Sequence, residues 1–241
     1  MDSHAHLAAR LAELAARGGR SRFLEPGESV ALAQKAAREA GVDVAFWGGY
    51  PGAERTVAAF YWAEPPQEFS IARLRAQWNG KYASLGPLDL LGALLGLGIE
   101  REMLGDILLC EDGARVFVLE EIAPYLLVNW DGADRAKLHV CREEGDFSPP
   151  EPEGEYLRET VNSLRLDAIL AAGYGLSREQ AQRLVRQGLV KLNHVECART
   201  DARVEAGDLI SARGYGRLRV EEELGKTRKD RLAVRLFRYG R

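Results

Sequence analysis

The chain has 241 residues, of which 46% are hydrophobic and 29% are charged, and its formal net charge is −3. These proportions are those of an ordinary globular protein, and they exclude disordered, collagen-like and disulfide-scaffold chains. The three cysteines, Cys110, Cys141 and Cys197, form no close pair, which fits a reducing cytosol and excludes a four-cysteine zinc cluster.

The first 78 residues (1–78) are predicted to form an α/β domain. Helical spacing of apolar residues predicts helices over residues 5–16 and 26–40, and Gly41 is the expected stop of the second helix. Strands are expected after it over residues 42–47, 56–62 and 69–78. The first helix interrupts its apolar residues with charged ones, unlike the continuous apolar core of a signal peptide, so export is not expected.

A second domain is predicted over residues 79–147, where helices and strands alternate as in a small α+β sandwich. The expected elements are helices over 87–97 and 120–128 and strands over 106–110, 115–119 and 135–142. The longest apolar stretch of the chain, Leu90–Ile99, is about half as long as the roughly 20 residues that span a bilayer. We therefore expect no membrane partner and a cytoplasmic location.

A proline-rich segment, residues 148–157, divides the chain and is predicted to be a semi-rigid linker, because proline favours extended backbone. Residues 1–154 carry 15 Lys and Arg against 24 Asp and Glu, a net charge of −9, whereas residues 155–241 carry 18 against 12, a net charge of +6. An acidic body joined to a basic domain, here residues 158–241, is typical of a chain in which one domain meets a polyanion. A solvated basic face would give the same count.

Two helices open this basic domain. The first is predicted over residues 162–170, with the Ser163 hydroxyl accepting hydrogen bonds from the first free amides. The second begins at a capping box formed by Ser177 and Gln180 and stops at Gly188. Cationic and amide side chains project around the second helix at Arg178, Gln182, Arg183 and Arg186. A helix N-terminus beside arginine donors is suited to bind phosphate.

Four short motifs follow one another here: Arg-Leu-Asp at 165–167, Ser-Arg-x-x-Ala-x-x-Leu at 177–184, Gly-x-Val-x-Leu-Asn at 188–193 and Gly-Asp at 207–208. Their order and spacing resemble the S4 RNA-binding domain, in which two helices and the loop and strand after them face RNA. The resemblance implies RNA-binding roles for Arg165, Ser177, Arg178, Gln180, Arg183, Arg186, Lys191 and Asn193. For Asp167, orienting Arg165 is the alternative to any contact of its own.

Further motifs lie at residues 23–26, 47–55, 89–102 and 105–108, and together with the S4 motifs they extend the resemblance over nearly the whole chain. They look like the successive signatures of the YlmH-like bacterial proteins, which have an N-terminal domain, a central domain like an RNA-recognition motif (RRM) and a C-terminal S4 domain. That family is associated with RNA and ribosomes, and in Gram-positive bacteria its genes lie near those of cell division. The central unit lacks the paired aromatics on adjacent strands that stack bases, which leaves a scaffold or protein-contact role open for it. The predicted fold class is α+β, with an N-terminal α/β domain, a small RRM-like α+β domain and an S4-type helix pair with β-hairpins.

The end of the chain is predicted to be a basic hairpin. Alternating residues predict strands over 215–224 and 232–236, joined by a turn. Three cations crowd that turn: Lys226, Arg228 and Lys229. A cationic tip would add phosphate contacts without reading sequence, and a solvated turn is the alternative.

The sequence predicts no catalytic residue, no metal site and no cofactor. Glycine-rich nucleotide loops and synthetase motifs are missing, and neither His139 nor His194 has a local nucleophile partner. The segment Arg165-Leu166-Asp167 resembles the catalytic motif of pseudouridine synthases, but the continuation of that motif is absent.

We therefore predict a non-catalytic RNA-binding protein that binds structured RNA, either rRNA or tRNA, on the ribosome. The sequence leaves the oligomeric state open, with a monomer favoured. A role in translation quality control extends this prediction, because the S4 proteins that this domain resembles include small ones that bind the large ribosomal subunit carrying a stranded peptidyl-tRNA. Two alternatives stay open: an RNA-modifying enzyme with its site in residues 1–150, and a protein adaptor linked to cell division.

Overall fold

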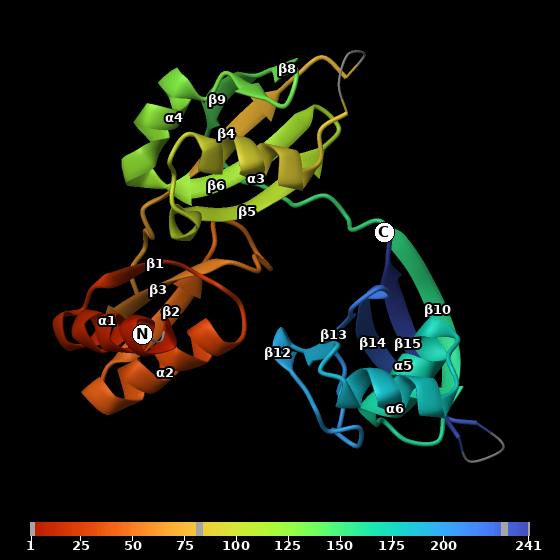
Figure 1. The fold of residues 1–241 in the computed structure, drawn as a ribbon. Coiled ribbons are helices and arrows are strands. Elements are labelled where there is room, and N and C mark those ends of the chain that lie inside the picture. The colour runs from red at the N-terminus through yellow and green to blue at the C-terminus, as the bar shows by residue number, and fades with distance from the viewer. Residues whose placement is uncertain (1–2, 81–83, 228–230, 241) are drawn as a thin grey trace. The chain divides into compact units, whose positions relative to one another are not determined.

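The polypeptide divides at its proline-rich segment in the computed structural model, which describes residues 3–80, 84–227 and 231–240. Contacts group the chain into two units, Met1–Pro150 and Glu151–Arg241 (Figure 1). The linker in the structure is shorter than the predicted one (148–157), because strand β10 (Gly154–Val161) begins within that range. Strand pairing with a distant segment, which the local proline pattern does not encode, accounts for this difference.

The first unit begins with a three-stranded antiparallel sheet in the order β1-β3-β2. Its elements are α1 (Ser3–Arg17), β1 (Arg20–Leu24), α2 (Glu28–Ala40), β2 (Asp43–Trp47) and β3 (Thr56–Tyr61). Apolar residues of α1 and α2, among them Leu11 and Ala33, pack with Phe60 of β3. Gly41 ends α2 in the left-handed conformation, as predicted, with φ of 67°.

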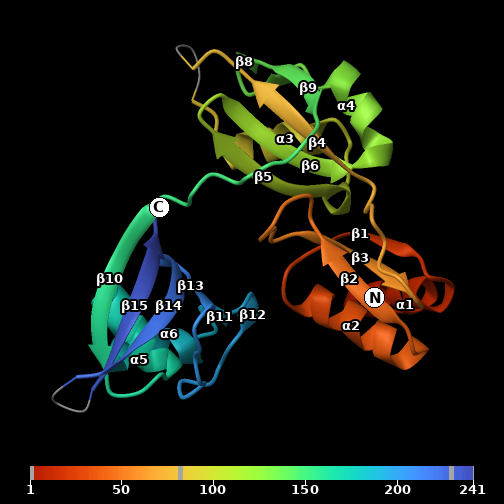
Figure 2. The same cartoon turned by 180° about the vertical axis from the view of Figure 1, so that it is seen from behind.

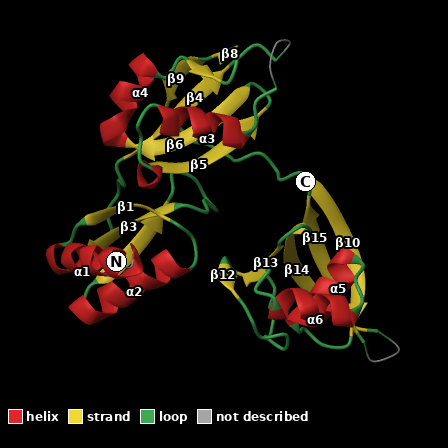
Figure 3. Ribbon diagram, viewed as in Figure 1, coloured by secondary structure: helices red, strands yellow, loops and turns green. Residues whose placement is uncertain are grey.

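A four-stranded antiparallel sheet in the order β5-β6-β4-β9 forms the rest of the first unit (Figure 3). The elements are β4 (Ile71–Gln77), α3 (Pro87–Gly96), the 3₁₀ turn Arg101–Met103, β5 (Leu104–Cys110), β6 (Gly113–Leu119), the 3₁₀ turn Glu120–Ile122, α4 (Ala123–Asn129), the short pair β7 (Gly132–Ala133) and β8 (Ala136–Lys137), and β9 (His139–Glu143). The chain order β-α-β-β-α-β with this strand order is that of an RNA-recognition motif, as expected.

Strand β4 lies inside this second sheet, between β6 and β9. The expected boundary at residue 78 would leave it with the first sheet, and on this point the prediction is wrong. Residues 71–77 alternate between buried and half-buried side chains, a pattern that identifies a strand but not its partner. Likewise, the strand expected over 135–142 is interrupted, because β8 pairs with β7 and only β9 joins the sheet.

The family-like motifs of the first unit meet around the buried Arg55 side chain. Its guanidinium group donates to the carbonyls of Leu104 and Arg101, at 2.8 and 3.2 Å, and forms an ion pair with Glu25. Asp106 accepts hydrogen bonds from the Tyr50 hydroxyl and from the amides of Glu54 and Arg55. These hydrogen bonds and this ion pair connect the two sheets of the unit, so the motif residues have a structural role.

The second unit is a six-stranded antiparallel sheet in the order β10-β15-β14-β13-β11-β12, with two helices on one face (Figures 1 and 2). Besides β10, its elements are α5 (Leu166–Tyr174), α6 (Arg178–Arg186), β11 (Val190–Leu192), β12 (Val195–Glu196), β13 (Leu209–Ala212), β14 (Gly216–Lys226) and β15 (Leu232–Tyr239). Ile169 of α5 and Val185 of α6 pack with Leu218 and Leu236 of the sheet.

The two helices of this unit begin in different ways. The capping box at α6 is confirmed: the Gln180 amide donates to the Ser177 hydroxyl at 3.1 Å, and the Ser177 amide donates to the Gln180 side chain at 2.9 Å. The prediction that Ser163 caps α5 is wrong. The amides of Leu166 and Asp167 instead donate to the carbonyls of Ala202 and Thr200, so a distant loop supplies this cap.

Within the described residues, no helix is both long enough and apolar enough to cross a membrane.

Candidate nucleic-acid interface

The fully buried carboxylate of Asp167, in the first turn of α5, connects the starts of the two helices. It accepts hydrogen bonds from Arg178 and Gln182 of α6, both at 2.8 Å, and from Arg165, at 3.2 and 3.3 Å. Burial alone would raise the pKa of this carboxyl, but the hydrogen bonds from Gln182, Arg165 and Arg178 outweigh burial and hold its pKa below the ordinary value. Asp167 therefore stays ionised at neutral pH.

This carboxylate fixes two of the predicted side chains, Arg165 and Arg178. Each guanidinium group has one side bound to Asp167 and is still about half exposed, with 41% and 45% of the side chain accessible. A guanidinium group has five N–H donors, so each arginine keeps donors for a ligand while its position is held. The interpretation that Asp167 orients Arg165 is thus confirmed. Sequence reasoning missed that Asp167 also accepts hydrogen bonds from Arg178 and Gln182.

The remaining predicted residues of α6 fall into two groups. Ser177 and Gln180 are engaged in the capping box, so they position the helix N-terminus. Arg183 and Arg186 are exposed, and Arg183 lies 3.4 Å from Glu179 across one helical turn. In the part of the chain that the structure describes, Arg186 has no ion pair. We name these four arginines, the half-buried Arg165 and the exposed Arg178, Arg183 and Arg186, the α5–α6 surface.

Asn193 has a different environment from that surface. It lies in the turn between β11 and β12 with φ of 50°, a conformation that Asn tolerates better than most residues. Its side chain donates to the Asp208 carboxylate at 2.7 Å and accepts from the Leu209 amide at 2.9 Å. The Leu-Asn and Gly-Asp motifs are therefore in contact and join this turn to the start of β13.

Lys191 is exposed on β11, between two residues, Val190 and Leu192, that pack in the helix-side core. Because side chains alternate along a strand, Lys191 lies on the sheet face turned away from the helices. The structure does not bring it to the α5–α6 surface. Lys226 ends β14, and the other two residues of the predicted cationic tip, Arg228 and Lys229, lie outside the described residues.

The four-stranded sheet of the first unit offers a different surface. On its face away from α3 and α4, Arg115 donates to Glu143 at 2.9 Å through two nitrogens, and Arg73 lies 3.0 Å from the same carboxylate. Phe117 of β6 is buried against Tyr50, with ring centroids 4.8 Å apart. Among the described residues of its two central strands, no aromatic ring is exposed for stacking on bases.

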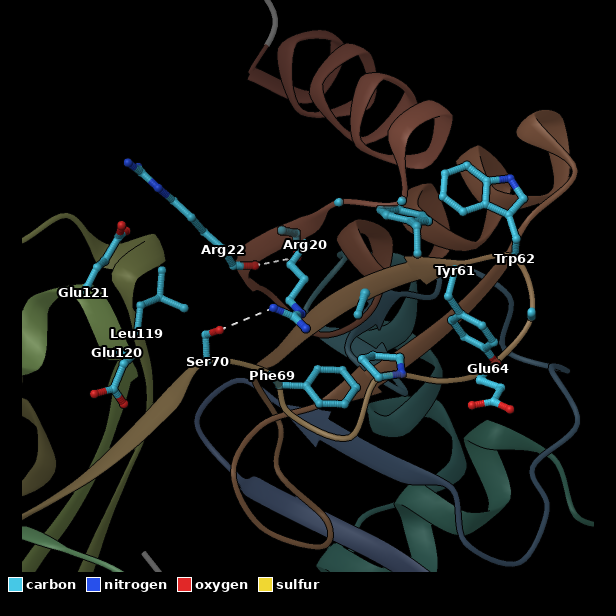
Figure 4. A pocket seen from close by; sticks show the side chains of 17 residues that line it. Arg20, Arg22, Tyr61, Trp62, Glu64, Phe69, Ser70, Leu119, Glu120 and Glu121 are labelled. Carbon is cyan, nitrogen blue, oxygen red and sulfur yellow. Dashed lines mark hydrogen bonds between the residues drawn. The ribbon is translucent and has the colours of Figure 1, made fainter.

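A pocket of about 970 Å³ lies in the first unit, where the ends of β1 and β3 approach the end of β6 (Figure 4). Tyr61, Trp62 and Phe69 contribute to its walls, and Arg20 donates to the Ser70 hydroxyl at 3.4 Å (Figure 4). Carboxylates also line it, at Glu64, Glu120 and Glu121. Its lining also contains Arg20 and Arg22, but Arg22 forms ion pairs with Glu100 and Glu102, so this pocket is a poor site for a phosphate backbone.

Groups of three or more His, Cys, Asp or Glu side chains that could hold a metal ion are not found in residues 3–80, 84–227 and 231–240.

Two models of known protein families match this chain, one in each of its two units. The family model "Putative RNA-binding domain in YlmH" matches residues 65–145, the segment that holds the whole four-stranded sheet, and the model "S4 domain" matches residues 164–210. Among solved structures, the chain resembles the cell division protein YlmH from Streptococcus pneumoniae, with a TM-score of 0.51 and 17% identity, over 58% of this chain and 89% of that chain. At this identity the likeness concerns the fold alone.

A curated relative is similar over most of its length. The chain is 34% identical over 216 residues to "Ribosome-associated protein quality control protein P2" of Bacillus subtilis (strain 168), and the match covers 88% of this chain and 84% of that protein. The chain therefore belongs to the YlmH-like family of bacterial RNA-binding proteins, which carry an S4 domain at the C-terminus.

Proposed function

We propose that this chain is a non-catalytic protein that binds structured RNA, either rRNA or tRNA, through its α5–α6 surface, and that it acts as a monomer on the ribosome in translation quality control. One observation carries the proposal: the buried Asp167 carboxylate holds Arg165 and Arg178 in place at the starts of two adjacent helices. Arg183 and Arg186 extend the same basic surface along α6.

The chemistry of this surface suits duplex RNA. The major groove of A-form RNA is too deep and narrow for side chains to read, so proteins recognise such RNA by its shape and its phosphates. Guanidinium groups bind phosphate oxygens with two parallel hydrogen bonds, and the positive end of a helix favours the same ligand. The net charge of +6 over residues 155–241 would attract RNA from a distance.

The ribosomal part of the proposal draws on the Bacillus relative, whose name describes a ribosome-associated quality control protein. In this proposal the chain works as three domains: an N-terminal α/β domain, an RRM-like domain and an S4 domain that contacts RNA. The first two would serve as an acidic scaffold, since residues 1–154 have a net charge of −9 and the open face of the RRM-like sheet carries ion pairs. A cytoplasmic location follows from the ribosomal partner.

The test is co-sedimentation with ribosomes of the double variant Arg183→Glu/Arg186→Glu. These two arginines are exposed and do not bind Asp167, so the variant changes the surface without breaking the buried network. We expect it to lose ribosome binding. A matched control is Lys35→Glu/Arg38→Glu on α2 of the first unit, which has the same change of charge at exposed positions and should sediment like the wild type.

Salt titration supplies a second measurement on the same variant. Each phosphate contact that is lost should reduce the slope of log affinity against log salt by about 0.9 for a duplex, so the double variant should lose roughly two units. Ribosome binding equal to that of the wild type, with an unchanged slope, would show that the α5–α6 surface is not the RNA site.

A further inference from the structure

The sheet of the second unit has an open face, opposite α5 and α6, that carries aromatic and cationic side chains. Leu218, Val220 and Leu236 pack in the helix-side core, so the residues that alternate with them on β14 and β15 lie on the other face. Cross-strand pairs place Tyr156 of β10 beside Phe237, and Phe237 beside Arg219. We name five side chains of this face the aromatic platform: Tyr156, Arg217, Arg219, Phe237 and Tyr239.

The rings of the platform are in direct contact. The centroid of Phe237 lies 4.9 Å from that of Tyr156 and 5.0 Å from that of Tyr239, both in edge-on arrangements. Arg217 lies over the Tyr239 ring at 5.0 Å, and Arg219 lies 5.7 Å from the centroid of Phe237. Such packing holds rings and guanidinium groups in fixed relative positions.

Exposure differs sharply among these rings. Phe237 is only 4% exposed and forms the floor of the cluster, whereas Tyr156 is 65% exposed and Tyr239 is half-buried. A tyrosine that leaves most of its ring in water gains little free energy from burial. The ring of Tyr156 is therefore accessible to a partner, and its contact with the buried Phe237 ring fixes its position.

The charged side chains on the face that carries the platform favour the binding of a polyanion. Alternation along the strands places Arg158, Lys191 and Arg235 on the face that carries the platform. The carboxylates of Glu221 and Glu222 pair with Arg219 and Arg235, at 2.6 and 3.0 Å. Glu196 pairs across strands with Lys191, so this face carries five cations (Arg158, Lys191, Arg217, Arg219 and Arg235) against three carboxylates.

We propose that the aromatic platform binds unpaired nucleotides of RNA, with bases stacked on Tyr156 and Tyr239 and phosphates contacting the neighbouring arginines and Lys191. Sheets that display aromatic rings stack the bases of single strands, and arginine adds cation–π contacts. Three of the strands concerned, β10, β14 and β15, lie outside the residues that match the S4 model, 164–210. The site goes beyond the proposed function because it takes a different form of RNA on a different face.

The experiment measures binding of the full chain to two fluorescein-labelled RNAs by anisotropy: an oligoadenylate of about ten nucleotides and a hairpin with a long duplex stem. Tyr156→Ala should weaken binding of the oligoadenylate by about 5- to 140-fold, the range for loss of one stacked base, and leave the hairpin affinity within about twofold. Tyr156→Phe keeps the ring and should bind like the wild type. Tyr125→Ala, which removes another exposed tyrosine from α4, is the matched control.

Tyr239→Ala provides a second loss of stacking should Tyr156→Ala fail to fold. Oligoadenylate binding that is unchanged in both alanine variants, or undetectable for the wild type, would overturn the proposal. If Tyr156→Ala lowered ribosome binding while its oligoadenylate affinity stayed unchanged, the platform would be a protein-docking surface, which also overturns it. Hairpin binding by Arg183→Glu/Arg186→Glu reports on the proposed function separately, so the two ideas can fail independently.

Discussion

Replacing Asp167 by Asn tests the link between the buried network and the basic surface. The amide has the shape of the carboxylate but no charge, and its NH₂ group would face donors of Arg165, Arg178 or Gln182. Hydrogen bonds to a charged group contribute about 1.5–3 kcal/mol each. Because both arginines are nearly half exposed, water screens their share, and we expect a total loss of about 2–4 kcal/mol.

Calorimetry of the full chain would measure this loss, since the two units, Met1–Pro150 and Glu151–Arg241, can unfold as separate transitions. For a unit of this size, 1 kcal/mol shifts the melting temperature by about 4–8 °C, so the transition of the second unit should fall by at least about 8 °C. The transition of the first unit should not move. Ribosome binding, measured below the lowered transition, should weaken because Arg165 and Arg178 lose their common anchor.

A shift of less than about 2 °C, together with normal ribosome binding, would refute this reasoning. It would mean that the arginines keep their positions without the charge of Asp167. Gln182→Ala is the matched comparison: it removes one neutral donor but keeps the charge of the same carboxylate, so it should lower stability by about 1.5 kcal/mol, less than Asp167→Asn.

Two further predictions concern the same unit. The stabilisation from Asp167 should be fully present above the ordinary carboxyl pKa of about 3.9 and should disappear as pH falls through the lower pKa of the folded state, so the difference in melting temperature between wild type and Asp167→Asn should shrink below about pH 4. Asn193→Ala removes two hydrogen bonds and forces alanine into a left-handed conformation, so urea denaturation should show a loss of about 2–3 kcal/mol; a loss below about 0.5 kcal/mol would contradict a structural role for this turn.

Local signals predicted well those features that depend on neighbouring residues. The capping box at Ser177 marked the start of α6 correctly, because its two hydrogen bonds join residues three apart. The left-handed stop at Gly41 was predictable for the same reason. Alternating helix and strand patterns also predicted the succession of α3, β5, β6 and α4, whereas the likeness to an RRM came from the family resemblance.

Features that depend on distant residues were missed or misplaced. Strand β4 alternates in the same way whichever sheet it joins, and the cap of α5 comes from carbonyls near residue 200 rather than from Ser163. The first half of strand β10 was assigned to the expected linker because its partner, β15, lies more than 70 residues away. In the candidate site, the arginines were predictable from the family motif, but the shared anchor at Asp167 depends on how two helices pack.

The pairing of β10 with β15 also sets an order for synthesis and folding. β15 lies between β10 and β14, and β10 pairs with it along its whole length, from Gly154 to Val161. As the chain leaves the ribosome, the helices and strands up to residue 226 can assemble first, while β10 waits for residues 232–239. Closing so long a loop is entropically unfavourable and slow, so the last strand to be made completes the sheet and, with Phe237 and Tyr239, the aromatic platform.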